Sequence, residues 1–380
     1  MMAANESTRV IADSAESRRY NRIQRWLGVA DFAIGFGLLV VLLATGWTQT
    51  LRDLAERGAA QNYSCAVFLY VLMLMLIAKA IGSPLDYYGF RLEHRFNLSN
   101  QRLGSWLWDE CKSFLIGLLM ATIAVELLYM LMRQSPQYWW VIAWAMFLVL
   151  MVLLAQLAPV VLFPIFYKFE ALEKEELKRR LIVLSERAGT RVRGVYKWHL
   201  SAKSKKANAA LTGLGATRRI ILADTLLDNY SDDEIEAVLA HELGHHAHRH
   251  ILKSILVQAG ITLFGFWLAD AVLTYAVERR HMFEYMSDFA NLPLLILVST
   301  VLSFLLMPAL NAYSRFNEQQ ADRYCFQSVA SVGPFISAMN KLAEQNLAER
   351  TPARWVEWLL HSHPAIAKRI AAAEAWAKSH

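Results

Sequence analysis

Residues 241–245, His-Glu-Leu-Gly-His, form the pattern in this chain that most directly suggests chemistry. On a helix, His241 and His245 stand one turn apart on the same face, so both imidazoles can bind a single zinc ion. Glu242 lies beside them, where its carboxylate can take a proton from a zinc-activated water and pass it to a leaving amine. The same pattern arises by chance on surface helices, so the rest of the chain must decide between the two readings.

A catalytic zinc ion needs a third protein ligand and one open coordination position. A third histidine six residues after the second is excluded, because Ile251 occupies that position. His248 lies one turn after His245, but a straight helix cannot easily wrap three ligands around one ion. Glu318 is the better candidate, and Asp322, one turn later, can accept a hydrogen bond from the free N–H of a liganding histidine. The alternative for this acidic pair is an ordinary exposed helix face.

Local signals put the two histidines on a helix next to a small sheet. Ser231 and Glu234 have the spacing of a capping box, so a helix begins at Ser231 and continues toward the next apolar segment. Residues 170–189 have an amphipathic helical pattern, and residues 191–198 and 218–223 are strand candidates.

A polar loop lies between the two strand candidates. Its three lysines, Lys203, Lys205 and Lys206, favour a solvated loop, with contact to anionic lipid as the alternative. The segment Asn208 to Leu211 follows, and we expect it to form an edge strand.

The composition indicates a membrane protein. The chain has 380 residues, of which 56% are hydrophobic, and such a chain cannot cover itself with a charged surface. The apolar residues form six blocks, each long enough to cross a hydrocarbon core of about 30 Å as a helix. The blocks run roughly from Leu27 to Gly46, Cys65 to Ile81, Ser113 to Met132, Trp139 to Phe163, Ser254 to Val277 and Leu292 to Leu310.

The distribution of arginine and lysine predicts the orientation. The segment before Leu27 is rich in arginine and lacks a signal-peptide cleavage site, so the first block remains as an anchor and the N-terminus is cytoplasmic. The later polar regions then fall on the same side, and the last two spans return Glu318 to the side of His241. The expected division is a cytoplasmic arm at 1–26, four spans at 27–163 with a cytoplasmic loop at 84–112, a first part of the zinc-protease domain at 164–253, a membrane hairpin at 254–310 and a second part at 311–380.

Several other functions are disfavoured. The net charge of +6 follows from the same basic bias, and no basic stripe interleaved with aromatic residues argues for a nucleic-acid partner. The three cysteines are scattered and suggest neither disulfides nor a thiolate metal site. Lys79, Glu126 and Asp270 lie within apolar blocks and should face protein or water, although Lys79 could instead snorkel to the interface. These charges raise a transporter as an alternative, but interrupted paired helices and an internal repeat are missing.

Together these motifs resemble the type 1 CAAX prenyl endopeptidases, integral-membrane zinc proteases that cleave near the C-terminus of isoprenylated proteins. The resemblance runs from about Ser17 to Ile370. It is carried by Pro84-Leu85-Asp86-Tyr87-Tyr88 with Leu92-Glu93 to Phe96, by Asn208-Ala209 to Leu226, by Val238 to His245, by Ser314-Arg315 with Glu318 to Asp322, and by His361-Ser362-His363-Pro364 with Arg369.

The resemblance implies a mainly α-helical polytopic membrane protein, in which a helical barrel surrounds a hydrated chamber. A cytoplasmic zinc-protease domain with a small β-sheet closes it. Asn208 and Ala209 would pair with the substrate as an edge strand. His363 would lie near the metal and stabilise an oxyanion, or else simply begin a helix. Arg369 is either a substrate-binding residue or a helix-surface cation. Members of the family commonly have seven membrane helices, whereas six are found here.

The sequence therefore predicts an integral-membrane zinc metalloendopeptidase that binds one zinc ion. Its catalytic residues are Glu242 and His363, and its metal ligands are His241, His245 and Glu318. Its partners are membrane lipid and a peptide or protein substrate that can carry a lipid, with CAAX-type C-terminal processing as the reaction. The alternative is a quality-control protease for membrane proteins that has no prenyl requirement.

Overall fold

Six long helices make up the part of the molecule that can cross a membrane. The computed structural model describes residues 13–213 and 217–380, and six helices in these ranges are long and apolar enough to span. They are α1 (Ala15–Thr45), α3 (Tyr63–Arg95), α4 (Leu103–Gln134), α5 (Trp139–Leu157) with its continuation through a π-helical turn (Ala158–Leu162) into α6 (Phe163–Phe166), α10 (His250–Thr274), which runs into another π-helical turn (Tyr275–Arg279), and α11 (Leu292–Ser328), which follows a short 3-10 turn (Phe289–Asn291). The mainly α-helical membrane fold and its six spans are confirmed.

Several of these helices extend beyond their apolar blocks. Helix α1 begins at Ala15, so the described part of the expected arm at 1–26 is mostly helical; residues 1–12 lie outside the described residues. Helix α3 continues to Arg95 and α4 begins at Leu103, so the loop expected at 84–112 shrinks to 96–102. Hydropathy marks only the segment that matches the bilayer, whereas a helix satisfies its own backbone groups and can continue into water.

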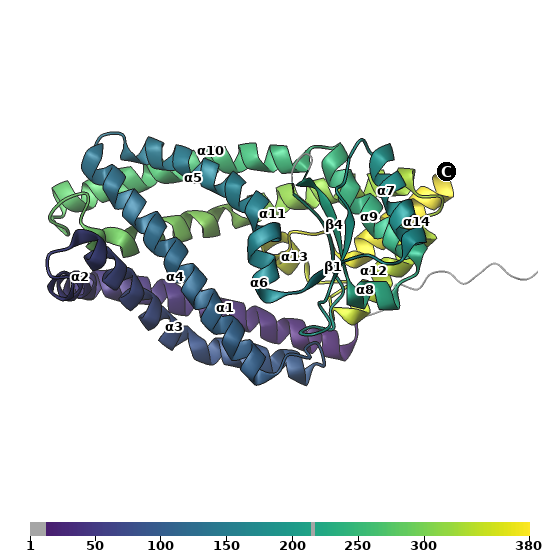
Figure 1. The fold of residues 1–380 in the computed structure, drawn as a ribbon, viewed down its shortest axis with the longest axis horizontal. Helices are drawn as coiled ribbons and strands as arrows, with labels where there is room; N and C mark the ends of the chain where they lie inside the picture. The colour runs from purple at the N-terminus through teal and green to yellow at the C-terminus, as the bar shows by residue number, and fades with distance from the viewer. Residues whose placement is uncertain (1–12, 214–216) are drawn as a thin grey trace, which may run out of the picture.

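Helix α2 (Trp47–Gly58), which the sequence did not predict, joins α1 to α3 at the end of the bundle away from the sheet (Figure 1). It is fixed by polar contacts, because Arg52 forms an ion pair of 2.5 Å with buried Asp288 and the Thr48 hydroxyl lies 2.6 Å from the Tyr70 hydroxyl. Because α2 is short and amphipathic, it lacks the long apolar run that identifies a span.

The charged residues within the spans have polar partners. The pairs are Lys79 with Asp86 and Glu110, Glu126 with Ser64, and Asp270 with Trp139. Charge in an apolar environment is costly unless it is paired, so these contacts explain how the bundle accommodates it.

A four-stranded sheet lies at the other end of the molecule (Figure 1). It consists of β1 (Phe169–Ala171), β2 (Val195–Trp198), β3 (Ala209–Thr212) and β4 (Arg219–Ala223), in the order β1-β2-β4-β3. Strands β2 and β4 are parallel, and the other two pairs are antiparallel. The two strand candidates and the expected edge strand are all present. Strand β1 was missed because three residues carry too little pattern.

Helices pack around this sheet and enclose a hydrophobic core that is separate from the packing of the membrane helices. They are α7 (Glu175–Arg187), α8 (Asp224–Asn229), α9 (Asp232–Ala247), α12 (Gly333–Gln345), α13 (Arg354–Leu360) and α14 (Ile366–Ser379). Leu181 of α7, Ile220 of β4, Ile235 and Leu243 of α9 and Phe335 of α12 belong to one buried cluster and are almost completely inaccessible. Because α9 sits within this core, its position is fixed by packing on several sides.

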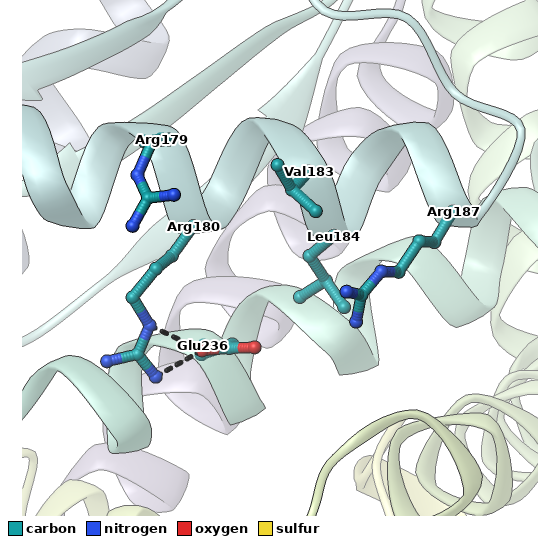
Figure 2. A pocket seen from close by; sticks show the side chains of 6 residues that line it. All are labelled: Arg179, Arg180, Val183, Leu184, Arg187 and Glu236. Carbon is teal, nitrogen blue, oxygen red and sulfur yellow. Dashed lines mark hydrogen bonds and ion pairs between the residues drawn. The ribbon is translucent and has the colours of Figure 1, made fainter.

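Helix α9 begins where the capping box predicted. The Ser231 hydroxyl accepts the Glu234 N–H, and the Glu234 carboxylate accepts the Ser231 N–H. From α7, Arg180 pairs with Glu236, as Figure 2 shows in a shallow hollow of the surface, and it also binds Asp233. The first turns of α9 are therefore held at their N-terminus and on their outer face.

The three lysines of the loop at 201–206 bind the membrane helices and their connection. Lys203 Nζ lies 2.5 Å from Asp109 of α4, Lys206 Nζ lies 3.0 Å from Glu93 of α3, and Lys205 contacts Asn97. Backbone hydrogen bonds join the same loop to residues 98–100. The segment is therefore not the freely solvated loop expected from the sequence, because its charges attach the protease part to the bundle.

The helix through the two histidines stops sooner than the sequence suggested. Helix α9 ends at Ala247, and α10 begins at His250. Between them Arg249 adopts the left-handed conformation, with φ 56° and ψ 35°. The sequence contains no glycine or proline at this point, so nothing marked the break.

Substitution of Arg249 tests this break. A left-handed conformation costs a residue with a side chain about 1–2 kcal/mol, and β-branched residues tolerate it worst. We expect Arg249→Val to lower the thermal unfolding temperature of the detergent-solubilised chain, and Arg249→Gly to leave it unchanged or raise it. A valine variant as stable as the glycine variant would contradict the described turn.

Candidate metal centre

Helices α9 and α11 bring three side chains together at one point. His241 Nε2 lies 3.3 Å from Glu318 Oε2, and His245 Nε2 lies 3.3 Å from Glu318 Oε1. The two Nε2 atoms are themselves 3.3 Å apart. One ligand atom from each of the three residues lies within 4.8 Å of the other two, and His248 is not in this group in the described part of the chain. The three residues that the sequence proposed as ligands are therefore neighbours.

The chemistry of this donor set suits a divalent metal ion. Two imidazole nitrogens and one carboxylate are a set found at catalytic zinc sites, where the fourth position stays open. Glu318 is 5% exposed, and no described residue donates a well-oriented hydrogen bond to its Oε2. A buried carboxylate oxygen without a hydrogen bond is costly unless a cation neutralises it. The residues present therefore fit a metal.

The second nitrogen of His241 faces a buried acidic group. His241 Nδ1 lies 2.9 Å from Asp322 Oδ1, which is where the sequence expected an orienting carboxylate. Burial alone would lower the pKa of His241, but its contacts with the carboxylates of Asp322 and Glu318 outweigh burial and raise the pKa to about 9. The carboxylates of Glu318 and Asp322 thus lie on the two sides of this imidazole, and their negative charge favours a cation beside it.

Arg369 lies behind this pair and does not face outward. From α14 its Nε and one terminal nitrogen bind the two oxygens of Asp322 at 2.9 and 2.6 Å, and the side chain is 10% exposed. The helix-surface alternative is therefore wrong. The expectation that Arg369 binds substrate also finds no support, because its guanidinium is directed at Asp322. The sequence could not reveal this partner, since the pairing joins two helices that are distant in the chain.

Glu242 and His363 are the other two residues that the sequence assigned to catalysis. Glu242 follows His241 on α9 and is half-buried, and its carboxylate makes no hydrogen bond or ion pair with any residue that the structure describes. His363 Nε2 lies 3.3 Å from Glu318 Oε1, yet its side chain remains 61% exposed. His363 therefore combines a contact with Glu318 with access to a second molecule, and Glu242 is next to His241 in the chain and partly accessible.

Asn208 and Ala209 lie at the margin of the sheet. Ala209 begins β3 and pairs with Leu222 of β4, while the Asn208 carbonyl accepts the Ala223 N–H. Because β3 ends the strand order, its outer side has no partner strand among the described residues. Strand β3 also packs against α9, the helix that carries both histidines.

A residue that sequence reasoning passed over sets the distance between the two helices. A Cβ atom at Gly244 would lie 2.8 Å from Ala321 Cα and 2.9 Å from the Ala321 carbonyl oxygen. Glycine is therefore required for the close approach of α9 to α11. The signal in the sequence was a glycine between the two histidines, because glycine is unfavourable inside a helix unless a close contact requires it.

Gly244→Ala tests whether this contact sets the metal site. We expect the added methyl to push α9 from α11, cost about 1–3 kcal/mol of stability and weaken metal binding, although no ligand is changed. Gly260→Ala on α10 is the matched control, because nothing lies within 4 Å of that position. Metal content after dialysis and the unfolding temperature measure the effect. Equal metal content in both variants would show that the Gly244–Ala321 contact does not set the metal site.

A second prediction concerns the Asp322–Arg369 pair. Arg369→Met leaves a buried carboxylate without its cation and should destabilise the protein by about 3–5 kcal/mol. The stability of Arg369→Lys should lie between those of the parent and Arg369→Met, because an ammonium keeps the charge but cannot form the two-pronged contact. Chemical unfolding in detergent measures both. If the free energy of unfolding of Arg369→Lys equals that of the parent, the two-pronged contact of Arg369 with Asp322 contributes nothing to stability.

Two family descriptions match the chain and together cover almost all of it. Residues 171–377 match peptidase family M48, and residues 10–168 match the family described as CAAX prenyl protease N-terminal, five membrane helices. The described part of the second range contains four helices long enough to span, together with the shorter α2.

Individual proteins agree with this assignment. The uncharacterized metalloprotease YhfN of Bacillus subtilis is 30% identical over 366 residues, which cover 96% of this chain and 86% of that protein. CAAX prenyl protease 1 of Saccharomyces cerevisiae is 28% identical, covering 79% and 70%. The crystal structure of S. mikatae Ste24p shares the fold, with a TM-score of 0.85 at 23% identity over 94% of this chain and 88% of that one. The chain belongs to peptidase family M48 and is an integral-membrane metalloprotease.

Proposed function

We propose that this metalloprotease uses a single zinc ion and cleaves lipid-bearing proteins near their C-terminus. The observation that carries the proposal is the convergence of His241, His245 and Glu318 from α9 and α11. Three protein ligands with an open fourth position are the arrangement of hydrolytic zinc enzymes. The lipid-bearing substrate is suggested by relatives named CAAX prenyl protease 1.

Glu242 acts as the general base. Its carboxylate is next to a ligand in the chain, has no partner among the described residues and remains partly accessible. It takes a proton from the attacking water and delivers it to the leaving amine. A bound zinc ion supplies the acidity of that water and polarises the scissile carbonyl.

His363 stabilises the negative charge that forms on the oxygen of the scissile carbonyl. Its exposed imidazole stands beside Glu318 and can donate a hydrogen bond to the oxyanion that forms as the carbonyl is attacked. Asp322 orients His241 through Nδ1, and Arg369 orients Asp322. Arg369 is therefore a positioning residue in this proposal, and not one that touches substrate.

The substrate binds as an added strand. The free edge of β3 beside α9 can pair with an extended peptide through backbone hydrogen bonds, starting near Asn208 and Ala209. Such pairing holds the chain straight across the three ligands and is indifferent to side-chain sequence. An extended C-terminal tail meets this requirement without unfolding a whole domain.

The same proposal includes the membrane arrangement. The N-terminus and both parts of the protease domain, 164–253 and 311–380, face the cytoplasm, and the membrane helices form a barrel around a hydrated chamber. Arginine before Leu27 supports the orientation by the positive-inside rule. Paired charges in the spans, such as Lys79 with Asp86, support a polar interior.

Glu242→Gln separates catalysis from metal binding. We expect the variant to retain zinc and lose roughly 100- to 10,000-fold in kcat, because a general base contributes about that much. Zinc content and peptide cleavage are measured on the same detergent-purified sample. Full cleavage by a zinc-loaded Glu242→Gln variant would exclude the assigned base.

The lipid requirement is tested with one peptide in two forms. A peptide ending in a CAAX sequence, with and without its isoprenoid, should differ in kcat/KM in favour of the lipidated form. Equal cleavage of both, combined with cleavage of an unfolded membrane protein, would instead favour a quality-control protease. A chelator must abolish all of these activities.

A further inference from the structure

The second ligand histidine is held by a chain of hydrogen bonds unlike the one that holds the first. His245 Nδ1 lies 3.0 Å from Nδ1 of His250, and His250 Nε2 lies 2.8 Å from Gln320 Oε1. His250 is 3% exposed and begins α10, whereas Gln320 lies on α11 two residues after Glu318. The left-handed turn at Arg249 is what brings His250 back against His245.

The order of partners fixes where each proton resides. The Gln320 amide oxygen can only accept, so the proton of neutral His250 must be on Nε2. His250 Nδ1 is then an acceptor, and His245 must donate from its own Nδ1. His245 Nε2 is thereby left bare, and this is the atom that faces Glu318 and His241. A polar contact on α11 thus determines the tautomer of an imidazole on α9.

We propose that His250 and Gln320 are positioning residues that hold His245 in its metal-binding tautomer and orientation. The proposal rests on the metal site of the proposed function. It assigns the two histidines different supports: His241 is backed by the charged Asp322–Arg369 pair, and His245 by a neutral relay. A neutral acceptor orients the ring without adding another negative charge beside the carboxylates of Glu318 and Asp322.

An alternative role for the same contacts is simple attachment of α10 to α11. The two roles differ in what they require at position 320. Attachment needs only a side chain that fills the space, whereas tautomer control needs an acceptor opposite His250 Nε2. Gln320→Leu keeps the size and helix propensity but removes the acceptor, while Gln320→Glu keeps an acceptor.

The experiment measures zinc affinity of the full-length, detergent-purified chain by competition with a chromogenic chelator, at about pH 8 so that His250 stays neutral. Loss of a hydrogen-bond partner of a ligand typically weakens metal affinity about 10- to 100-fold, and we expect that loss for Gln320→Leu and His250→Phe. Gln320→Glu and the control His248→Gln should stay within about threefold of the parent. His248 lies next to the relay and stacks on His250 but is not part of it.

Cobalt substitution and thermal unfolding of the metal-free protein accompany each titration. The absorption spectrum of bound cobalt should change for Gln320→Leu and remain for Gln320→Glu, and the metal-free unfolding temperatures of these two should agree. If Gln320→Leu binds zinc as tightly as the parent, or if Gln320→Glu loses as much as Gln320→Leu, the relay is excluded. If His250→Phe does not fold, the comparison of Gln320→Leu with Gln320→Glu still tests the relay.

Glu318→Ala separates this inference from the proposed function. It should abolish zinc binding outright, whereas the relay variants only weaken it. If Glu318→Ala binds zinc like the parent, the metal site itself is wrong. If it loses zinc while Gln320→Leu does not, only the relay is wrong.

Discussion

The contact between α9 and α11 at Gly244 and Ala321 is the constraint on which the site depends. Two helices can share a metal only if their backbones approach closely enough for short side chains to meet. The absence of a side chain at Gly244 permits that approach. On either side of the contact, His241 and His245 from one helix face Glu318 and Asp322 from the other. The same contact also brings Gln320 within reach of His250.

Much of this arrangement was predictable because its signals are local. Six apolar blocks reveal six spans, since the bilayer imposes a length and a composition on each. The capping box at Ser231 and the spacing of His241 and His245 are likewise read within a few residues. The topology then put Glu318 on the same side as the histidines, and the structure brings these residues together.

The features that the sequence did not predict depend on tertiary pairing. Nothing near Arg369 indicates that its guanidinium would meet Asp322, and nothing near Lys203 indicates Asp109 on a distant helix. The turn at Arg249 was hidden for a different reason. It uses a residue with a side chain in a conformation that usually belongs to glycine, so the apparent helix continued through it.

The two halves of the metal site are attached to the membrane in different ways. Glu318 sits on α11, a helix that runs from Leu292 to Ser328 with Pro308 inside it, so the carboxylate is carried by the same helix that can cross the membrane. The histidines lie on α9, which the turn at Arg249 separates from the span that follows. Because the close contact at Gly244 holds α9 against α11, the histidines follow that helix and keep their place opposite Glu318, while the turn at Arg249 leaves the direction of α10 independent of them.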